Sequence, residues 1–226
     1  MAAILKAKSI ERSGDGDDIY LRSVLSGSLS VADFFAVMAL TGRMYTVNAG
    51  LVTTPVTWTA TATIDITLPV LFGRIPSDKG IIPVSLWLYM EAFGTSAQFE
   101  CEAKIGTGGS LTSGGTTRTA VCTRSDIEGG SGTLWTEGGN SILAVGSIAR
   151  INRFWRDGAQ FAITKTAGSA TVAATDPNKF KWSAKETGEI HVAGPDSQLA
   201  IYQGSQAGTG FAGITYVEVP KSWLPT

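Results

Sequence analysis

The chain has 226 residues and a formal net charge of −1, and only 16% of its residues are charged, against about 25% in a typical globular protein. This balance argues against a strongly electrostatic nucleic-acid binder. No apolar run approaches the roughly 20 residues that a transmembrane helix requires. The first residues also lack the apolar core of a signal peptide.

The scarcity of charge has a consequence for the surface. A soluble monomer normally covers itself with Lys, Arg, Glu and Asp. We therefore expect much of this surface to lie against other copies of the chain. A well-packed monomer coated with Ser, Thr and Gly is the alternative.

Residues 1–43 are expected to form an N-terminal arm that carries one helix, Val31–Leu40. Ser30 is a suitable N-cap, and Asp33 stands three residues later, in the capping-box position. Gly42 can supply the left-handed residue that ends the helix.

This helix has apolar residues nearly all round, and such a helix must be covered on most sides. Its larger apolar residues are Phe34, Phe35, Val37, Met38 and Leu40. We expect them to order the arm through contacts between subunits.

Residues 44–226 predict one β domain. Strand-like segments alternate with turns rich in Gly, Asp and Pro, and no helical segment is long enough for parallel crossovers. We expect an antiparallel β-sandwich of the jelly-roll kind, or a closed barrel. The expected strands are Val56–Leu68, Ile81–Phe93, Gln98–Ile105, Thr117–Arg124, Ile142–Ile151, Ala159–Thr164, Lys179–Ala184, Gln198–Gln203 and Phe211–Val219.

The two cysteines, Cys101 and Cys122, flank a Gly-rich loop symmetrically. If their strands form a hairpin, the cysteines face each other, either as buried thiols or as a disulfide. In opposite sheets of a jelly roll they would not meet. The third strand also alternates: Phe99, Cys101, Ala103 and Ile105 are expected inside, and Gln98, Glu100, Glu102 and Lys104 outside.

The sequence offers no pattern for catalysis. His191 is the only histidine, and no nucleophile pattern stands beside it, so we expect an ordinary residue at a strand end. Structural zinc usually needs four Cys or His ligands, and the acidic segment Asp15–Asp18 lacks the spacing of an EF-hand loop. We therefore expect neither an enzyme nor a cofactor or metal.

One segment combines basic and aromatic residues: Arg150, Arg153, Phe154, Trp155 and Arg156. On a regular strand, Arg150, Phe154 and Arg156 share one face, and Arg153 and Trp155 share the other. That split weakens a single platform for nucleic acid. A subunit interface is the first interpretation of Arg150, Arg153, Trp155 and Arg156; ordinary surface and weak contact with a genome are the alternatives.

In overall form the chain resembles viral coat proteins of the single jelly-roll kind. The features are an arm with a short helix, eight or more strands, turns rich in Gly, Ser, Thr and Pro, and a last strand ending at Thr215-Tyr-Val-Glu-Val-Pro220. The missing basic arm departs from coats that package single-stranded RNA by charge.

The resemblance implies a structural virion protein that is made in the host cytoplasm. It would assemble with many copies of itself into a capsid shell and contact other virion proteins. The alternative is a β-sandwich recognition module, such as a trimeric adhesin, a phage receptor-binding head or a lectin. In that case exposed Trp135 and Trp223 would stack on sugar.

Overall fold

The computed structural model divides by its internal contacts into two units, Met1–Val37 and Met38–Thr226. In the smaller unit, β1 (Leu5–Ala7) pairs antiparallel with β2 (Ile19–Leu21). The helix α1 (Phe34–Leu40) begins in that unit and ends in the larger one. The structure describes residues 5–7, 19–21, 33–58, 63–93, 98–127, 130–138, 144–145, 149–160, 178–204 and 207–224.

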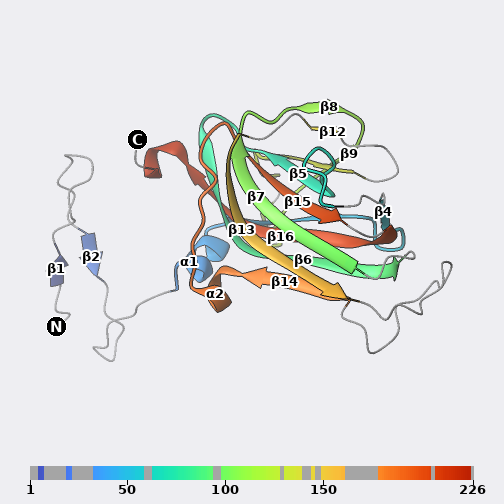
Figure 1. Ribbon diagram of the computed structural model, residues 1–226. Helices are drawn as coiled ribbons and strands as arrows, with labels where there is room; N and C mark the ends of the chain where they lie inside the picture. Colours follow the sequence, from blue (N-terminus) through green and yellow to red (C-terminus); the bar gives the residue numbers. More distant parts are fainter. Residues whose placement is uncertain are drawn as a thin grey trace. The chain divides into compact units, whose positions relative to one another are not determined.

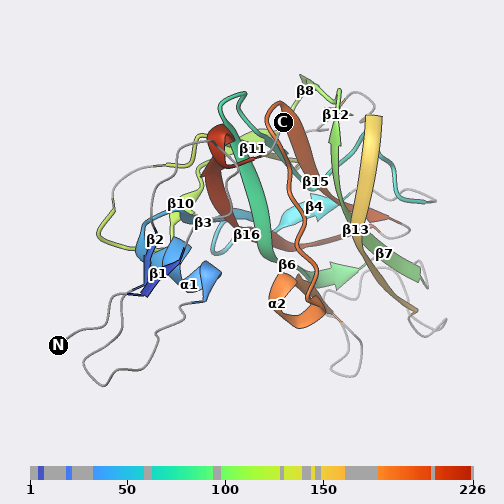
Figure 2. The same ribbon diagram turned by 90° about the vertical axis from the view of Figure 1, so that its left-hand side faces the viewer.

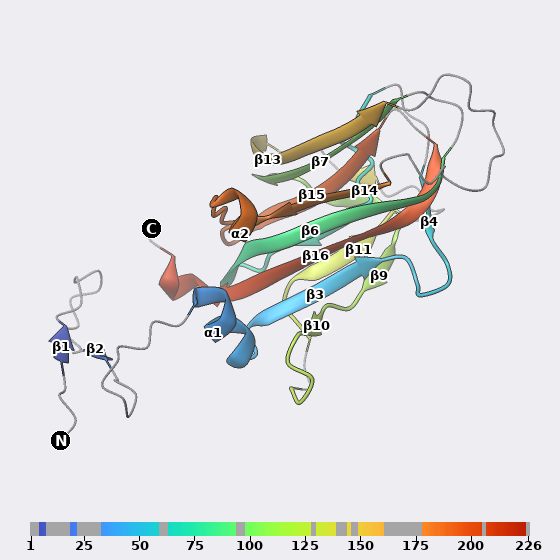
Figure 3. The ribbon, with the colours of Figure 1, turned by 90° about the horizontal axis from the view of Figure 1, so that it is seen from below.

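The larger unit is built on two antiparallel sheets (Figure 1). Figure 3 shows the long strands of the first sheet side by side. In order across that sheet they are β10 (Val121–Cys122), β3 (Met44–Ala49), β16 (Gly208–Pro220), β6 (Lys79–Phe93) and β14 (Lys179–Ser183), with β4 (Val56–Trp58) also paired to β16.

The second sheet lies against the first, and its long edge strand runs beside β7 (Figure 2). In order its strands are β13 (Ala149–Gln160), β7 (Gln98–Thr107), β15 (Ser197–Gly204), β5 (Leu71–Arg74), β11 (Leu134–Glu137) and β9 (Thr116–Arg118). Smaller elements are the pair β8 (Leu111–Ser113) and β12 (Ala144–Val145), helix α2 (Ala184–Thr187) and the 3₁₀ helix Lys221–Trp223. The expected antiparallel β-sandwich with a short helix ahead of it is confirmed.

Eight strands form a nested series of pairs. In chain order they are β3, β5, β6, β7, β13, β14, β15 and β16. The first pairs with the eighth, the second with the seventh, the third with the sixth, and the fourth with the fifth. Every consecutive step except β7 to β13 crosses from one sheet to the other. The chain is therefore arranged as one long antiparallel hairpin that is folded over into two layers.

The core between the sheets follows the predicted alternation of β7. Phe99, Cys101, Ala103 and Ile105 are all buried, and Phe99 contacts rings that belong to the opposite sheet. Trp135 of the second sheet donates a hydrogen bond of 2.9 Å to the hydroxyl of Tyr216 in the first. The two sheets are thus joined by apolar packing and by a buried polar link.

Asp33 and Gly42 set the two ends of helix α1. The backbone N–H of Phe35 donates to the Asp33 carboxylate at 3.1 Å, so Asp33 caps the helix. Gly42 has φ +72°, and the N–H of Arg43 donates to the carbonyl of Met38, as expected for a glycine-ended helix. The predicted glycine end is confirmed, whereas Ser30 lies outside the described residues.

Several predicted strands have different bounds. Among the described residues of the segment Val56–Leu68, β4 is the strand, and Asp65 closes a turn by accepting hydrogen bonds from the backbone and hydroxyl of Thr67. Residues 59–62 lie outside the described residues. The segment Thr117–Arg124 is split between β9 and β10, which lie in opposite sheets. The strands β1, β2, β3, β5, β8 and β11 were not predicted. Residues 161–164 of the predicted strand Ala159–Thr164 lie outside the described residues.

Candidate functional site

His191 is a packing residue in this structure. Its ring lies 5.0 Å from the ring of Phe154 and 5.8 Å from that of Trp182. Its two nitrogens each lie 3.3 Å from a polar atom, of Asn152 and of Glu189. In the described part of the chain, no group of three or more His, Cys, Asp or Glu side chains could hold a metal ion. No helix there is long and apolar enough to cross a bilayer.

Of the two arrangements considered for the cysteines, the structure has the one in which they lie in opposite sheets and do not meet. Cys101 lies on β7 in the second sheet, whereas Cys122 lies on β10, which pairs with β3 in the first. Both are buried free thiols. Burial is the main cause that raises the pKa of the Cys101 thiol, so this cysteine is an inert core residue.

The tryptophans proposed for sugar stacking differ in exposure. Trp135 is fully buried and packs over Gly73, where a side-chain carbon would lie 2.6 Å from its ring. It therefore cannot stack on a ligand, and that expectation is wrong. Trp223 is half exposed, and the guanidinium of Arg43 lies 4.7 Å from its ring centre.

The apolar residues expected at a subunit interface are also divided. Phe34 is 42% exposed, and its ring meets that of Phe35 edge to face. Met38 is buried within its own subunit, which removes it from the set available to a neighbour. Leu40, which belongs to the same set, is 72% exposed.

A β-bulge in β13 changes the predicted faces of the basic–aromatic segment. The register shifts between Arg153, opposite Lys104, and Trp155, opposite Ala103. Arg153 and Arg156 therefore share the outward face and are exposed, contrary to the predicted split. Trp155 is buried, so it does not belong to an interface in this conformation. Arg150 lies on β13, and its side chain is outside the described residues.

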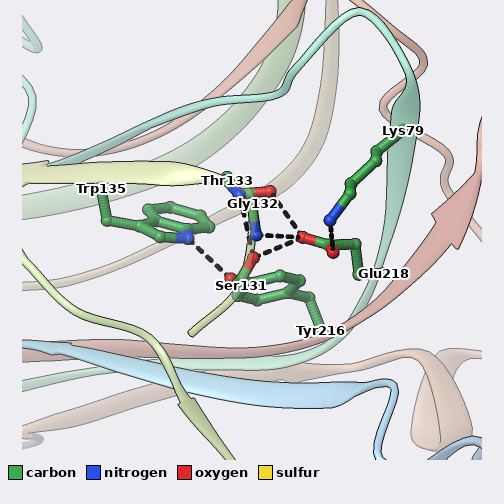
Figure 4. Close-up of polar contacts among 7 residues, drawn as sticks. All are labelled: Lys79, Ser131, Gly132, Thr133, Trp135, Tyr216 and Glu218. Carbon is green, nitrogen blue, oxygen red and sulfur yellow. Dashed lines mark hydrogen bonds and ion pairs between the residues drawn. The ribbon is translucent and has the colours of Figure 1, made fainter. Parts of the chain in front are cut away.

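A buried carboxylate, Glu218 on β16, gathers four hydrogen-bond donors (Figure 4). Lys79 donates at 2.6 Å, the hydroxyl of Ser131 at 2.5 Å and the backbone N–H of Gly132 at 2.9 Å. The hydroxyl of Thr133 lies at 3.5 Å. We call these five residues the Glu218 cluster. Hydrogen bonds to a buried charge are among the stronger ones in proteins.

The Glu218 cluster joins parts of the chain that are far apart in sequence. It connects the start of β6 and the segment 130–133 to the end of β16. The Tyr216 hydroxyl accepts the Trp135 bond beside it, and burial raises the pKa of Tyr216. The hydrogen bond to Glu218 is the main cause that raises the pKa of Lys79. A hollow of about 250 Å³ opens beside the cluster, lined by Arg43, Tyr45 and Asp78 among others.

A second buried carboxylate lies on the outward face of the second sheet. Glu102 and Lys104 form an ion pair on β7, and both are 2% exposed. The guanidinium Nε of Arg153 lies 3.6 Å from the other oxygen of Glu102. The prediction that Glu102 and Lys104 face solvent is therefore wrong.

Neighbouring side chains explain this burial. Tyr202 lies opposite Glu102 in the register, and its ring lies 5.0 Å from the ammonium of Lys104. Ile64 and Leu111 pack against the cluster that Tyr202 forms with Phe72 and Ala200. The outward face of the sheet is therefore partly covered beside Glu102 and Lys104.

A hollow of about 350 Å³ opens over these charged groups. We call it the Glu102 hollow. Arg156, bonded to Glu100 at 3.0 Å, lies at its rim. The full lining is Thr63, Ile64, Ile66, Gln98, Glu100, Glu102, Lys104, Arg153 and Arg156.

Comparisons with known proteins add no relative. No protein-family model, curated protein or solved structure matches the chain.

Proposed function

We propose that the chain is a structural virion protein that assembles with copies of itself into a capsid shell. The nested strand pairs carry this proposal. A long antiparallel hairpin that folds over into two four-stranded layers is the arrangement of a jelly roll, an architecture used by viral capsid and lectin domains. We interpret the sandwich as that fold.

The distribution of apolar residues supports assembly. Leu40 is 72% exposed, Val121 64% and Trp223 52%. The chain also has few charges with which to keep such residues in solution as a monomer. Burial against a neighbouring subunit would stabilise each of these side chains by about 1.5–3 kcal/mol.

The rival function, a recognition module, shares the architecture. Its support is weaker because Trp135, one of the two tryptophans proposed to stack on sugar, belongs to the core. The balanced charge favours assembly through protein contacts, with at most weak contact to a genome. The proposed location is the virion.

Negative-stain microscopy of the purified full chain and of a chain lacking residues 1–37 tests the proposal. The deletion stops before Met38 because that residue belongs to the unit that contains the sandwich. We expect closed shells from the full chain. The shortened chain should keep its β-type circular dichroism and form smaller particles or none. Discrete trimers from the full chain would instead support the recognition module.

A further inference from the structure

We propose that the Glu102 hollow binds a small organic molecule that carries a carboxylate or phosphate group. The proposal concerns a ligand site and does not depend on capsid assembly. It rests on which hydrogen-bonding groups of the hollow are engaged and which are left over. It also rests on the size and wall of the hollow.

The floor of the hollow holds a buried ammonium group with unused donors. Lys104 has three N–H bonds, and its contacts in the described structure are the Glu102 carboxylate and the face of the Tyr202 ring. A buried ammonium normally has hydrogen-bond partners for its N–H groups. One carboxylate and one ring face do not use all three donors of Lys104, so it can still donate to an acceptor above it.

The rim adds two guanidinium groups. Arg153 approaches Glu102 only through Nε, at 3.6 Å. Arg156 uses one terminal nitrogen on Glu100. Each guanidinium has five N–H donors in a planar fork that matches a carboxylate or a phosphate. The bulge in β13 places both on the same side of the sheet.

The two carboxylates of the hollow already face cations. The two oxygens of Glu102 face Lys104 and Arg153, and one oxygen of Glu100 accepts from Arg156. Three cationic and two anionic side chains line the hollow, so the charge left over is positive. The complementary ligand is rich in acceptors and negatively charged.

The size and the remaining wall point to an organic molecule. A volume of about 350 Å³ lies at the lower end of the range for small-molecule sites. Ile64 and Ile66 give the hollow an apolar side, which suits the carbon skeleton of such an anion. The Tyr202 hydroxyl below Ile64 is buried and has no hydrogen-bond partner among the described residues, so this region holds a further unused polar group.

Isothermal titration calorimetry on the full chain tests the site. The probes are succinate, inorganic phosphate and neutral succinamide, at constant pH and ionic strength. We expect saturable binding of at least one anion, with a Kd of about 1 mM or tighter, and none of succinamide. Which anion binds decides between carboxylate and phosphate. Absence of saturation with both anions, or equal binding of succinamide, would overturn the proposal.

A pair of variants locates the binding. Arg153→Gln removes a side chain that is 60% exposed, so the fold should survive. We expect it to weaken anion binding about tenfold, since a hydrogen bond to a charged group is lost. Lys181→Gln is the matched control, because it removes another exposed cation, on β14 in the first sheet. Equal weakening by both variants, or none by Arg153→Gln, would place the anion elsewhere and refute the proposal.

Discussion

Two buried carboxylates, Glu218 in the first sheet and Glu102 in the second, are stabilised in different ways. Glu218 is surrounded by one ammonium, two hydroxyls and a backbone N–H. Glu102 meets cations, Lys104 and Arg153. In the first arrangement both oxygens of the Glu218 carboxylate accept hydrogen bonds, and these bonds hold three chain segments together. The second leaves donors unused, which is why we assign structure to one and ligand binding to the other.

The largest effect on stability is expected from Glu218→Ala. Its four donors would lose their acceptor together, and a buried ion pair broken on one side is strongly destabilising. We expect the free energy of unfolding in urea to fall by about 4 kcal/mol. Glu186→Ala, which removes an exposed carboxylate, should cost less than about 0.5 kcal/mol. Similar losses for both variants would contradict a structural role for the Glu218 cluster.

Lys104→Met should have the next largest effect. It leaves Glu102 buried with only the distant Arg153, at an expected cost of about 3 kcal/mol. Replacing the pair together, as Glu102→Gln with Lys104→Met, removes the uncompensated charge and should recover most of this loss. The same urea titration checks both. A double variant as unstable as Lys104→Met alone would show that the charges are not coupled.

Two tyrosines provide a smaller contrast. Tyr216→Phe removes the acceptor of the Trp135 bond and should cost about 1–2 kcal/mol at neutral pH. Tyr202→Phe removes a buried hydroxyl with no partner among the described residues. The free energy of unfolding of this variant should therefore equal or slightly exceed that of the original chain. The comparison fails if Tyr202→Phe is the more damaging substitution.

Alkaline pH should lower stability gradually. Burial raises the pKa of Cys101, Tyr202 and Tyr216 in the folded protein. The unfolded chain releases these protons near pH 9.0 for cysteine and 10.0 for tyrosine, while the folded chain keeps them. The unfolded state then binds fewer protons, so the free energy of unfolding falls as pH rises above about 9. Each group contributes at most about 1.4 kcal/mol per pH unit.

Urea titrations between pH 7 and pH 10.5 measure this slope. Tyr202→Phe should reduce it above pH 10, where the free tyrosine would lose its proton in the unfolded chain. A stability that is flat or rising over this range would contradict the burial of these groups.

Local patterns in the sequence were sufficient for part of the fold. The alternation over Gln98–Ile105 correctly placed Phe99, Cys101, Ala103 and Ile105 in the core, and Gly42 correctly marked the end of α1. Both features depend on neighbouring residues alone. The same alternation wrongly placed Glu102 and Lys104 in solvent because their neighbours on that face, Tyr202 and Ile64, come from other parts of the chain.

The two charged clusters depend on contacts that no local pattern reveals. Ser131 and Glu218 are 87 positions apart, and neither stands in a recognisable motif. The bulge that brings Arg153 and Arg156 to one face is a shift in the pairing of β13 with β7, and such a shift depends on both strands. Trp135 was expected in a loop because β11 was not predicted, and only the pairing with β5 places it in the core.

Sedimentation velocity of the full chain, over a range of concentrations, tests the proposed assembly most directly. The account predicts a fast-sedimenting species of fixed size that coexists with free subunits. The fraction of the protein in that species should increase as the total concentration rises. A single slow boundary, with the mass of a monomer or a trimer at every concentration, would contradict it.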